Sequence, residues 1–214
     1  MDHNPIAIRV FDAWAKGYNE AFMDTSMYHG MFDHFCSAIE PRNAEVLELA
    51  CGPGNITHYL LKQRPDLRIL GTDLAPKMLE LAQANNPGAS FQPLDARKIL
   101  SLGRSFDAIV CGFCLPYLTP QETRDLIRDA AKALRPNGVL FLSTMEDDPA
   151  RSGFKASSTG EGEAAYIQYY EANFLTKTLR SNGFEVLHLD RKAYAGRDGL
   201  LTTDLLIVAK QVAL

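Results

Sequence analysis

The chain has 214 residues, 46% of them hydrophobic, which is enough to bury one substantial core. Its net charge of -4, with Lys and Arg scattered, argues against a broad surface for nucleic acid or anionic membrane. The N-terminal stretch MDHNPIAIRV lacks the pattern of a signal peptide, and no apolar run reaches the roughly 20 residues of a membrane span. We therefore expect a soluble cytoplasmic protein without nucleic-acid or membrane partners. The sequence favours no particular oligomeric state.

Residues 6–40 carry apolar side chains at helical spacing, and Gly17 and Gly30 are expected to break the stretch into pieces. One interpretation is a helical cap that packs on the sheet. The other is a lid, which the aromatic and polar tips of Trp14, Tyr18, Tyr28 and His29 favour. Either way, residues 1–40 form an N-terminal unit distinct from a main domain over 41–214.

Residues 45–57 (EVLELACGPGNIT) predict a strand, a tight glycine turn and a helix start. The apolar run Glu45–Ala50 suits a strand buried on both faces, and it ends at Cys51-Gly52-Pro53-Gly54. Asn55 is expected to be the N-cap of a helix over 56–62. Such a unit lets the backbone approach a nucleotide-like ligand, and the helix start offers unpaired N–H groups.

A regular alternation of strands and helices follows. Further strands are expected at about 68–74, 89–95 (an edge strand, because of Pro93), 106–113, 139–145, 184–194 and 202–210. Helices are expected over 76–85 and 120–135. A last helix is expected after the 147–168 segment; it would reach about Ser181, with Gly183 as its C-cap. Residues 147–168, rich in Gly and Ser, predict an insertion or mobile loop. The fold class is therefore α/β, a doubly wound and mostly parallel sheet whose last two strands form an antiparallel hairpin around Ala195–Gly199.

Two carboxylates follow successive strands at the edge where such sheets bind ligands. Asp73 lies about 20 residues after the glycine turn, where a carboxylate can accept from both hydroxyls of a ribose. Asp95 ends the next strand and could accept from an exocyclic amine of a base. The alternative for each is that it only caps the following helix.

No metal or redox site is predicted. Cys111 and Cys114 have C-x-x-C spacing, but the sequence has no second such pair to complete a zinc site. We expect these two cysteines, like Cys36 and Cys51, to be small buried side chains. His29 and His34 are five residues apart and do not share a helix face. The acidic run Glu146-Asp147-Asp148 could hold a divalent ion, but a solvated loop is the favoured interpretation.

Five motifs in this order resemble those of the class I S-adenosylmethionine-dependent methyltransferases: 48–54 (ELACGPG), 71–75 (GTDLA), 94–96 (LDA), 106–110 (FDAIV) and 134–140 (LRPNGVL). The resemblance covers about residues 40–146 by motif and reaches 214 by topology. It implies a seven-stranded sheet with an antiparallel last strand. It also implies S-adenosylmethionine as the cofactor and a methyltransferase activity.

The resemblance also implies roles for single residues. The loop that contains Glu48, Ala50, Cys51, Gly52 and Gly54 would wrap the methionine part of the cofactor, and Asp73 would hold its ribose. Leu74 and Met78 would pack near the adenine, whose amine would donate to Asp95 beside Ala96. The backbone at Cys111 and Gly112 would meet the amino group. Trp14 and Tyr18 would close over the cofactor. Asn55 stands where the family usually has a small residue, a mild departure.

The acceptor is expected to be a small molecule. The Asn-Pro-Pro-Tyr type signature of amine and base methylation is absent, since 113–118 reads FCLPYL. His29 and Tyr117 are candidates for a general base. Tyr28, Tyr166, Tyr169 and Tyr170 are candidates for contacts with the substrate, with core or rim packing as the alternative for each.

Three other functions fit parts of the pattern. A nicotinamide-dependent oxidoreductase is disfavoured because Thr57 stands where the third glycine of G-x-G-x-x-G should be. A non-catalytic protein that binds S-adenosylmethionine would share the cofactor residues. So would an enzyme that uses this cofactor without methylating, because fold does not fix function.

Overall fold

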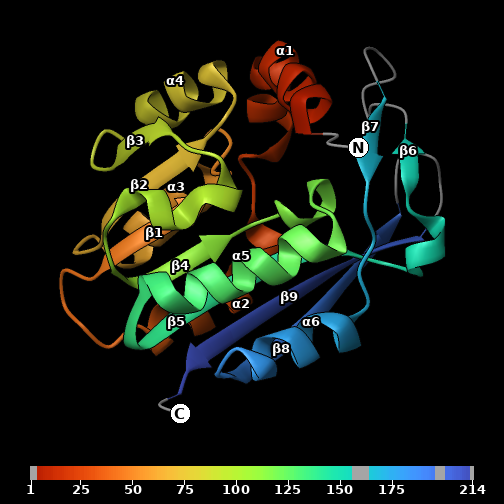
Figure 1. The fold of residues 1–214 in the computed structure, drawn as a ribbon. Coiled ribbons are helices and arrows are strands. Elements are labelled where there is room, and N and C mark those ends of the chain that lie inside the picture. The colour runs from red at the N-terminus through yellow and green to blue at the C-terminus, as the bar shows by residue number, and fades with distance from the viewer. Residues whose placement is uncertain (1–3, 156–163, 196–200, 213–214) are drawn as a thin grey trace.

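The computed structural model describes residues 4–155, 164–195 and 201–212, and it has three layers with a sheet in the middle (Figure 1). The sheet has seven strands in the order β3-β2-β1-β4-β5-β9-β8. They are β1 (Glu45–Leu49), β2 (Arg68–Asp73), β3 (Ser90–Pro93), β4 (Phe106–Cys111), β5 (Leu134–Glu146), β8 (Phe184–Ala195) and β9 (Leu201–Gln211). The first five run parallel, and β9 runs antiparallel between β5 and β8. The predicted fold class, the edge position of β3 and the C-terminal hairpin are confirmed.

Helices cover both faces of the sheet, with α5 and α6 on one side and α2 and α3 on the other (Figure 1). Their bounds are α1 (Asn4–Phe22), α2 (His29–Ala38), α3 (Asn55–Gln63), α4 (Pro76–Asn85), α5 (Pro120–Ala133) and α6 (Ala172–Ser181). Four short 3-10 turns are η1 (Ser26–Tyr28), η2 (Ala96–Leu102), η3 (Leu115–Tyr117) and η4 (Pro149–Arg151). Helix α1 packs on α4 through Ala15, Ala75 and Met78.

Alternating side chains of each central strand fill two separate cores. In β5, Leu140 and Leu142 pack with α5 and α6, while Val139 and Phe141 pack with α2 and α3. A strand buried on both faces needs apolar residues at every position, so the central strands read as continuous apolar runs. This is why periodicity located them well.

The N-terminal helices differ from the expectation. Helix α1 continues through Gly17, and Gly30 lies inside α2, so the predicted breaks at these glycines are wrong. A Cβ at Gly17 would lie 2.1 Å from Trp14 Nε1, so this glycine makes room for the indole ring. The chain leaves the helix after Phe22 instead, where Asp24 Oδ1 accepts from Ser26 N at 2.9 Å and so favours a local turn.

The region after β5 also contains more structure than expected. Strand β5 begins at Leu134 rather than 139, because Leu134 pairs with Phe106. Within the 147–168 insertion, β6 (Gly153–Lys155) and β7 (Ala165–Ile167) form an antiparallel pair. Residues 156–163 of the insertion and 196–199 of the predicted hairpin turn lie outside the described residues.

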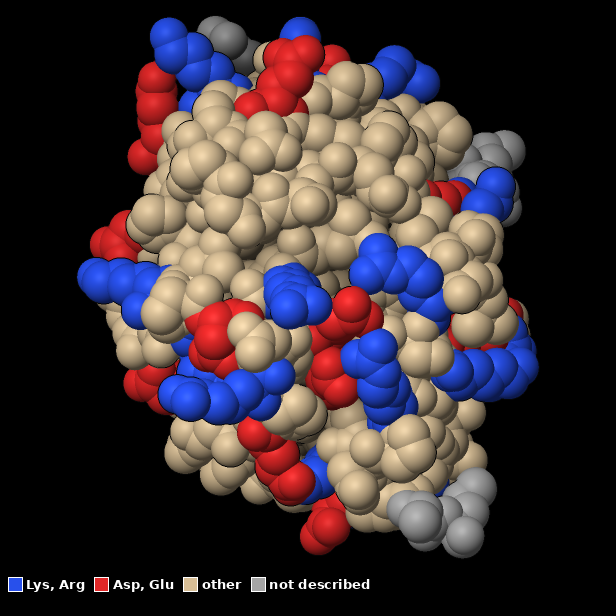
Figure 2. Space-filling view, turned by 90° about the vertical axis from the view of Figure 1, so that its left-hand side faces the viewer, with Lys and Arg blue, Asp and Glu red and all other residues tan. Residues whose placement is uncertain are grey.

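Charges of both signs are mixed on the face shown in Figure 2, where Lys and Arg lie next to Asp and Glu over the lower half and along the top edge, with an uncharged area between. Within the described ranges, no helix is long and apolar enough to cross a membrane.

We expect Phe141→Ala to lower the free energy of unfolding by about 3–5 kcal/mol, because the ring is fully buried between Phe32 and Phe35. Phe154→Ala is the matched control, since that ring is 56% exposed and its loss should cost about 1 kcal/mol or less. Urea unfolding of both variants measures the difference. Equal losses would contradict this account of the core.

Candidate functional site

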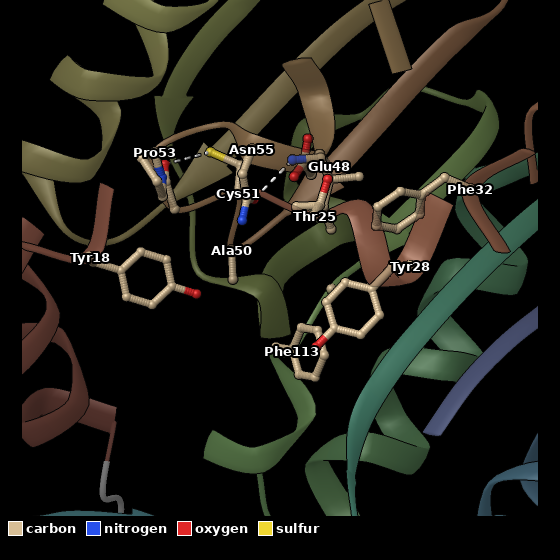
Figure 3. A pocket seen from close by; sticks show the side chains of 13 residues that line it. Tyr18, Thr25, Tyr28, Phe32, Glu48, Ala50, Cys51, Pro53, Asn55 and Phe113 are labelled. Carbon is tan, nitrogen blue, oxygen red and sulfur yellow. Dashed lines mark hydrogen bonds between the residues drawn. The ribbon is translucent and has the colours of Figure 1, made fainter. Parts of the chain in front are cut away.

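A cavity lies where the loops after β1 and β4 meet the N-terminal helices (Figure 3). This is the edge at the carboxyl ends of the parallel strands, where doubly wound folds bind ligands. The lining residues come from both units of the chain: Tyr18, Thr25, Tyr28, Phe32, Glu48, Ala50, Cys51, Gly52, Pro53, Asn55, Ile56, Gly112 and Phe113.

The loop after β1 turns through three left-handed residues, Ala50 (φ 50°), Gly52 (φ 54°) and Gly54 (φ 79°). At Gly54 an added Cβ would also lie 2.4 Å from Asn86 Nδ2, so only glycine fits there. Gly54 is the N-cap of α3, one residue before the predicted cap at Asn55. Asn55 Nδ2 instead donates to Phe22 O at 2.9 Å and ties the loop to the end of α1.

Asp73 joins the loops that follow β1 and β2. Its Oδ2 accepts from Gly52 N at 2.9 Å and its Oδ1 accepts from Ala75 N at 2.8 Å. Burial raises the pKa of this carboxyl although these two bonds favour its charge. Each carboxylate oxygen has a second acceptor position, so the predicted contact with a ribose is compatible with both bonds.

Glu48 is a buried acid behind the same loop. Its side chain is 1% exposed and accepts a short hydrogen bond from Thr57 Oγ1, which links β1 to α3. Burial raises the pKa of Glu48 to about 7 despite that bond. Thr57 therefore has a structural partner at the position where a dinucleotide-binding turn would have glycine.

Asp95 is engaged by Arg97. It caps η2 by accepting from Arg97 N at 2.9 Å, and the guanidinium lies 2.7 Å from Asp95 Oδ2 and 2.7 Å from Glu122 Oε1. Burial would raise the pKa of Asp95, but the hydrogen bonds from Arg97 lower it below its usual value. Asp95 does not line the cavity, so its contact with an adenine amine stays a prediction.

Aromatic rings form the walls of the cavity, with Tyr18 on one side and Tyr28 and Phe113 on the other (Figure 3). The hydroxyl of Tyr18 points inward, and burial, followed by the charge of Asp73, raises its pKa to about 12. Phe113 has φ 52°, held by a bond from its N to Ser143 Oγ at 3.0 Å. Tyr28 lies beside it at a ring-centroid distance of 5.5 Å.

Eight residues with predicted cofactor contacts lie outside the lining: Gly54, Asp73 and Asp95, described above, and the five that follow. Cys111 is fully buried at the end of β4, and Met78 is buried between α1 and α4. Trp14 packs edge-on against Tyr18 at 5.7 Å and so supports that ring. Leu74 is the first residue after β2, and Ala96 is the residue after Asp95.

The two candidate bases also lie outside the lining. His29 stacks on Tyr59 with ring centroids 4.0 Å apart, and its Nε2 is 3.4 Å from Thr25 Oγ1. Tyr117 packs edge-on against Phe11 at 5.2 Å. The geometry therefore favours neither as the group that meets a substrate.

The tyrosines predicted for the substrate separate in the structure. Tyr28 lines the cavity, whereas Tyr166 packs on Phe154 in the β6–β7 pair and Tyr169 N donates to Ser152 Oγ at 3.0 Å. Tyr170 is 2% exposed in the core, where its hydroxyl bonds Thr123 Oγ1 and Leu118 O. That position supports packing rather than substrate contact for Tyr170.

The acidic run after β5 is used in structural contacts. Glu146 accepts from Ala172 N and pairs with Arg191, while Asp147 pairs with Arg151 and Asp148 caps η4. All four cysteines are free and buried. Over residues 4–155, 164–195 and 201–212, no three His, Cys, Asp or Glu side chains are grouped to hold a metal ion.

Sequence reasoning missed several residues of the site. Phe113 could have been inferred from its place directly after Gly112. Asn85 and Asn86 hold the glycine loop by donating to Pro53 O and Gly54 O, both at 2.9 Å, which only tertiary contact reveals. Asp204, whose carboxylate bonds Tyr28, carried a signal as the single charge at the start of the apolar run of β9.

Tyr170→Phe should lower the free energy of unfolding by about 1–3 kcal/mol, because it leaves the buried Thr123 hydroxyl without its partner. The affinity for S-adenosylhomocysteine should be unchanged. Urea unfolding and calorimetric titration measure the two quantities. A variant with wild-type stability and a lower affinity for S-adenosylhomocysteine would contradict the packing role and show that Tyr170 contributes to ligand binding.

Glu48→Gln should flatten the pH dependence of stability. An acid whose pKa is raised by folding favours the folded state at low pH and withdraws that stability as it ionises, here as pH rises through about 7. From about pH 5 to about pH 8 the variant should therefore lose about 3 kcal/mol less than wild type. Denaturant unfolding across this range tests it, and identical curves would contradict it.

Comparison with known proteins places this site in a family. A family model described as a methyltransferase domain matches residues 46–138. The chain is 29% identical over 141 residues to the demethylmenaquinone methyltransferase of Thermotoga maritima, covering 64% of this chain and 60% of that protein. It is 32% identical over 167 residues to the ubiquinone biosynthesis O-methyltransferase of Xanthomonas axonopodis pv. citri, covering 72% of this chain and 68% of that protein.

A solved structure shares the whole fold. The crystal structure of magnesium protoporphyrin IX methyltransferase from Synechocystis PCC 6803, with bound SAM, has a TM-score of 0.72 and 16% identity, covering 99% of this chain and 98% of that one. The chain spans 60% and 68% of the length of the two curated relatives. By its sequence match and its sheet, the chain belongs to the class I S-adenosylmethionine-dependent methyltransferases, whose cofactor is S-adenosylmethionine.

Proposed function

We propose that this protein transfers the methyl group of S-adenosylmethionine to a small-molecule acceptor. The observation that carries the proposal is the cavity itself, which joins the glycine loop after β1 to a wall of aromatic rings from α1, η1 and the end of β4. The names of the two curated relatives, one of which names demethylmenaquinone and the other ubiquinone biosynthesis, support a small acceptor. A location in the cytoplasm, as the sequence predicts, is part of this proposal.

The residues present fit the cofactor. The φ of 54° at Gly52 opens the loop towards the cavity, and an added Cβ there would face the ring of Tyr18 at 3.9 Å. The loop backbone would follow the methionine part of the cofactor, and Asp73 would bind the ribose. Asp95, Leu74, Met78 and Ala96 would surround the adenine.

The cofactor supplies a methyl group already activated on a sulfonium, so the protein has to bind, align and exclude water. The N-terminal unit over 1–40 is suited to the last task. Helix α1 is joined to α4 by Asp12 Oδ1, which accepts from Lys77 N at 2.9 Å, and by Asn85 Nδ2, which donates to Asn19 Oδ1 at 2.8 Å. We infer that this unit closes over the cofactor with Tyr18 as its inner residue.

S-adenosylhomocysteine should bind wild type, and Asp73→Asn should weaken that binding about 10- to 100-fold, because one charged acceptor of two ribose hydroxyls is lost. Calorimetric titration measures both affinities. Asp190→Asn is the matched control, since Asp190 lies on β8 and pairs with Lys192.

NAD is the control ligand, and we expect no binding because Thr57 occupies the third glycine position. If folded wild type does not bind S-adenosylhomocysteine, the proposed function is overturned. Tight binding without transfer to any acceptor would instead favour a protein that binds the cofactor for regulation.

A further inference from the structure

A buried carboxylate lies beside the cavity and has no role in cofactor binding. Asp204 is 0% exposed and stands opposite Met145 of β5. Because β9 runs antiparallel, its beginning lies at the edge where the parallel strands end. The fold therefore brings an acid from the C-terminal strand to the cavity that the N-terminal half builds.

Two tyrosines face this carboxylate. Tyr28 Oη donates to Asp204 Oδ2 at 2.6 Å, and Tyr194 Oη lies 3.5 Å from Asp204 Oδ1. Lys192 is opposite Asp204 in the β8–β9 register, but its Nζ pairs with Asp190 at 2.7 Å. Within the described part of the chain, Asp204 forms no ion pair, so its proton exchange runs through phenol groups.

Tyr28 connects this carboxylate to the cavity. Its ring lines the cavity next to Phe113 (Figure 3), while its hydroxyl donates to Asp204 Oδ2. A phenol oxygen that donates its proton keeps lone pairs that can accept another one. The wall thus offers a flat apolar surface with one hydrogen-bond acceptor, which suits a planar ring that carries a hydroxyl group.

We propose that Tyr28 and Asp204 accept the proton of a hydroxyl-bearing aromatic substrate, a phenol or an enol, during its methylation; this rests on the proposed function. The substrate hydroxyl donates to Tyr28 Oη. As its oxygen forms a bond to the methyl carbon, the S–CH₃ bond breaks and its electron pair stays on sulfur. The substrate proton passes to Tyr28 Oη and the proton of Tyr28 passes to Asp204. Once the product has left the cavity, Asp204 returns a proton to Tyr28 Oη, and Tyr28 releases one to water. Tyr28 is the catalytic residue and Asp204 the positioning residue behind it.

The charge state of Asp204 suits this step. Burial raises its pKa to about 6, although the bonds from Tyr28 and Tyr194 oppose the shift, so it is ionised near neutral pH. A base works best when its pKa lies near the operating pH. The other titratable groups on this side are Lys192 and Asp190 of β8, and His188 farther along β8 with His34 of α2 stacked on it. Tyr18 and Tyr169 raise the pKa of Tyr28 or Tyr194.

The test compares two acceptors of different acidity, phenol and 4-nitrophenol, at a pH where only the second is ionised. Asp204→Asn and Tyr28→Phe should lower kcat for phenol by about 10²- to 10⁴-fold, the usual contribution of a general base. They should lower kcat for 4-nitrophenol by about tenfold or less, because no proton remains to be accepted. The wild-type kcat/KM for phenol should rise with pH through about 6, and Asp204→Asn should abolish that rise.

Asp125→Asn is the matched control and should leave both rates unchanged, because Asp125 lies on α5 and pairs with Arg128. Titration of S-adenosylhomocysteine into every variant reports folding and the cofactor site, and Asp204→Asn should match wild type. Equal losses on both acceptors would show a purely structural role and overturn the proposal. Wild type that binds S-adenosylhomocysteine but methylates neither phenol overturns this proposal alone, whereas failure to bind it overturns the proposed function as well.

Discussion

The site depends on the carboxylate of Asp73, which fixes the glycine loop relative to the next loop. A backbone that passes through left-handed conformations at Ala50, Gly52 and Gly54 leaves N–H groups without a helix or sheet partner. Asp73 accepts one of them, and Asn85 at the end of α4 and Asn86 after it bind two of the loop carbonyls. The loop is therefore held in shape by its neighbours, and it can present its inner surface to a ligand without rearranging.

Two buried carboxyl groups, those of Glu48 and Asp204, lie next to the cavity. Glu48 and Asp204 both have a pKa raised by burial, and each is joined to the protein by hydroxyl groups rather than by a cation. Isolated buried charges cost folding energy, so such groups concentrate where function needs them. Glu48 bonds Thr57 behind the glycine loop and Asp204 bonds Tyr28 of the aromatic wall, so the two acids lie against different parts of the cavity.

The cap shows how local rules can mislead. Glycine inside a helical pattern usually signals an end, but at Gly17 the absence of a side chain makes room for Trp14, which in turn supports Tyr18. The real end, at Phe22, is set by Asp24 and by the bond from Asn55 to Phe22 O. A residue far along the sequence thus helps to fix where the first helix stops.

The sequence alone determined the sheet, the glycine loop and the places of Asp73 and Asp95, because these follow from local apolar runs, turn residues and the position of strand ends. It also identified Tyr18 and Tyr28. Only the tertiary structure decided that Tyr28 lines the cavity and Tyr170 does not, since the two have the same chemistry and differ in what surrounds them. The pairing of Tyr28 with Asp204 joins residues 176 positions apart, a contact that depends on the antiparallel course of β9 and that no local pattern encodes.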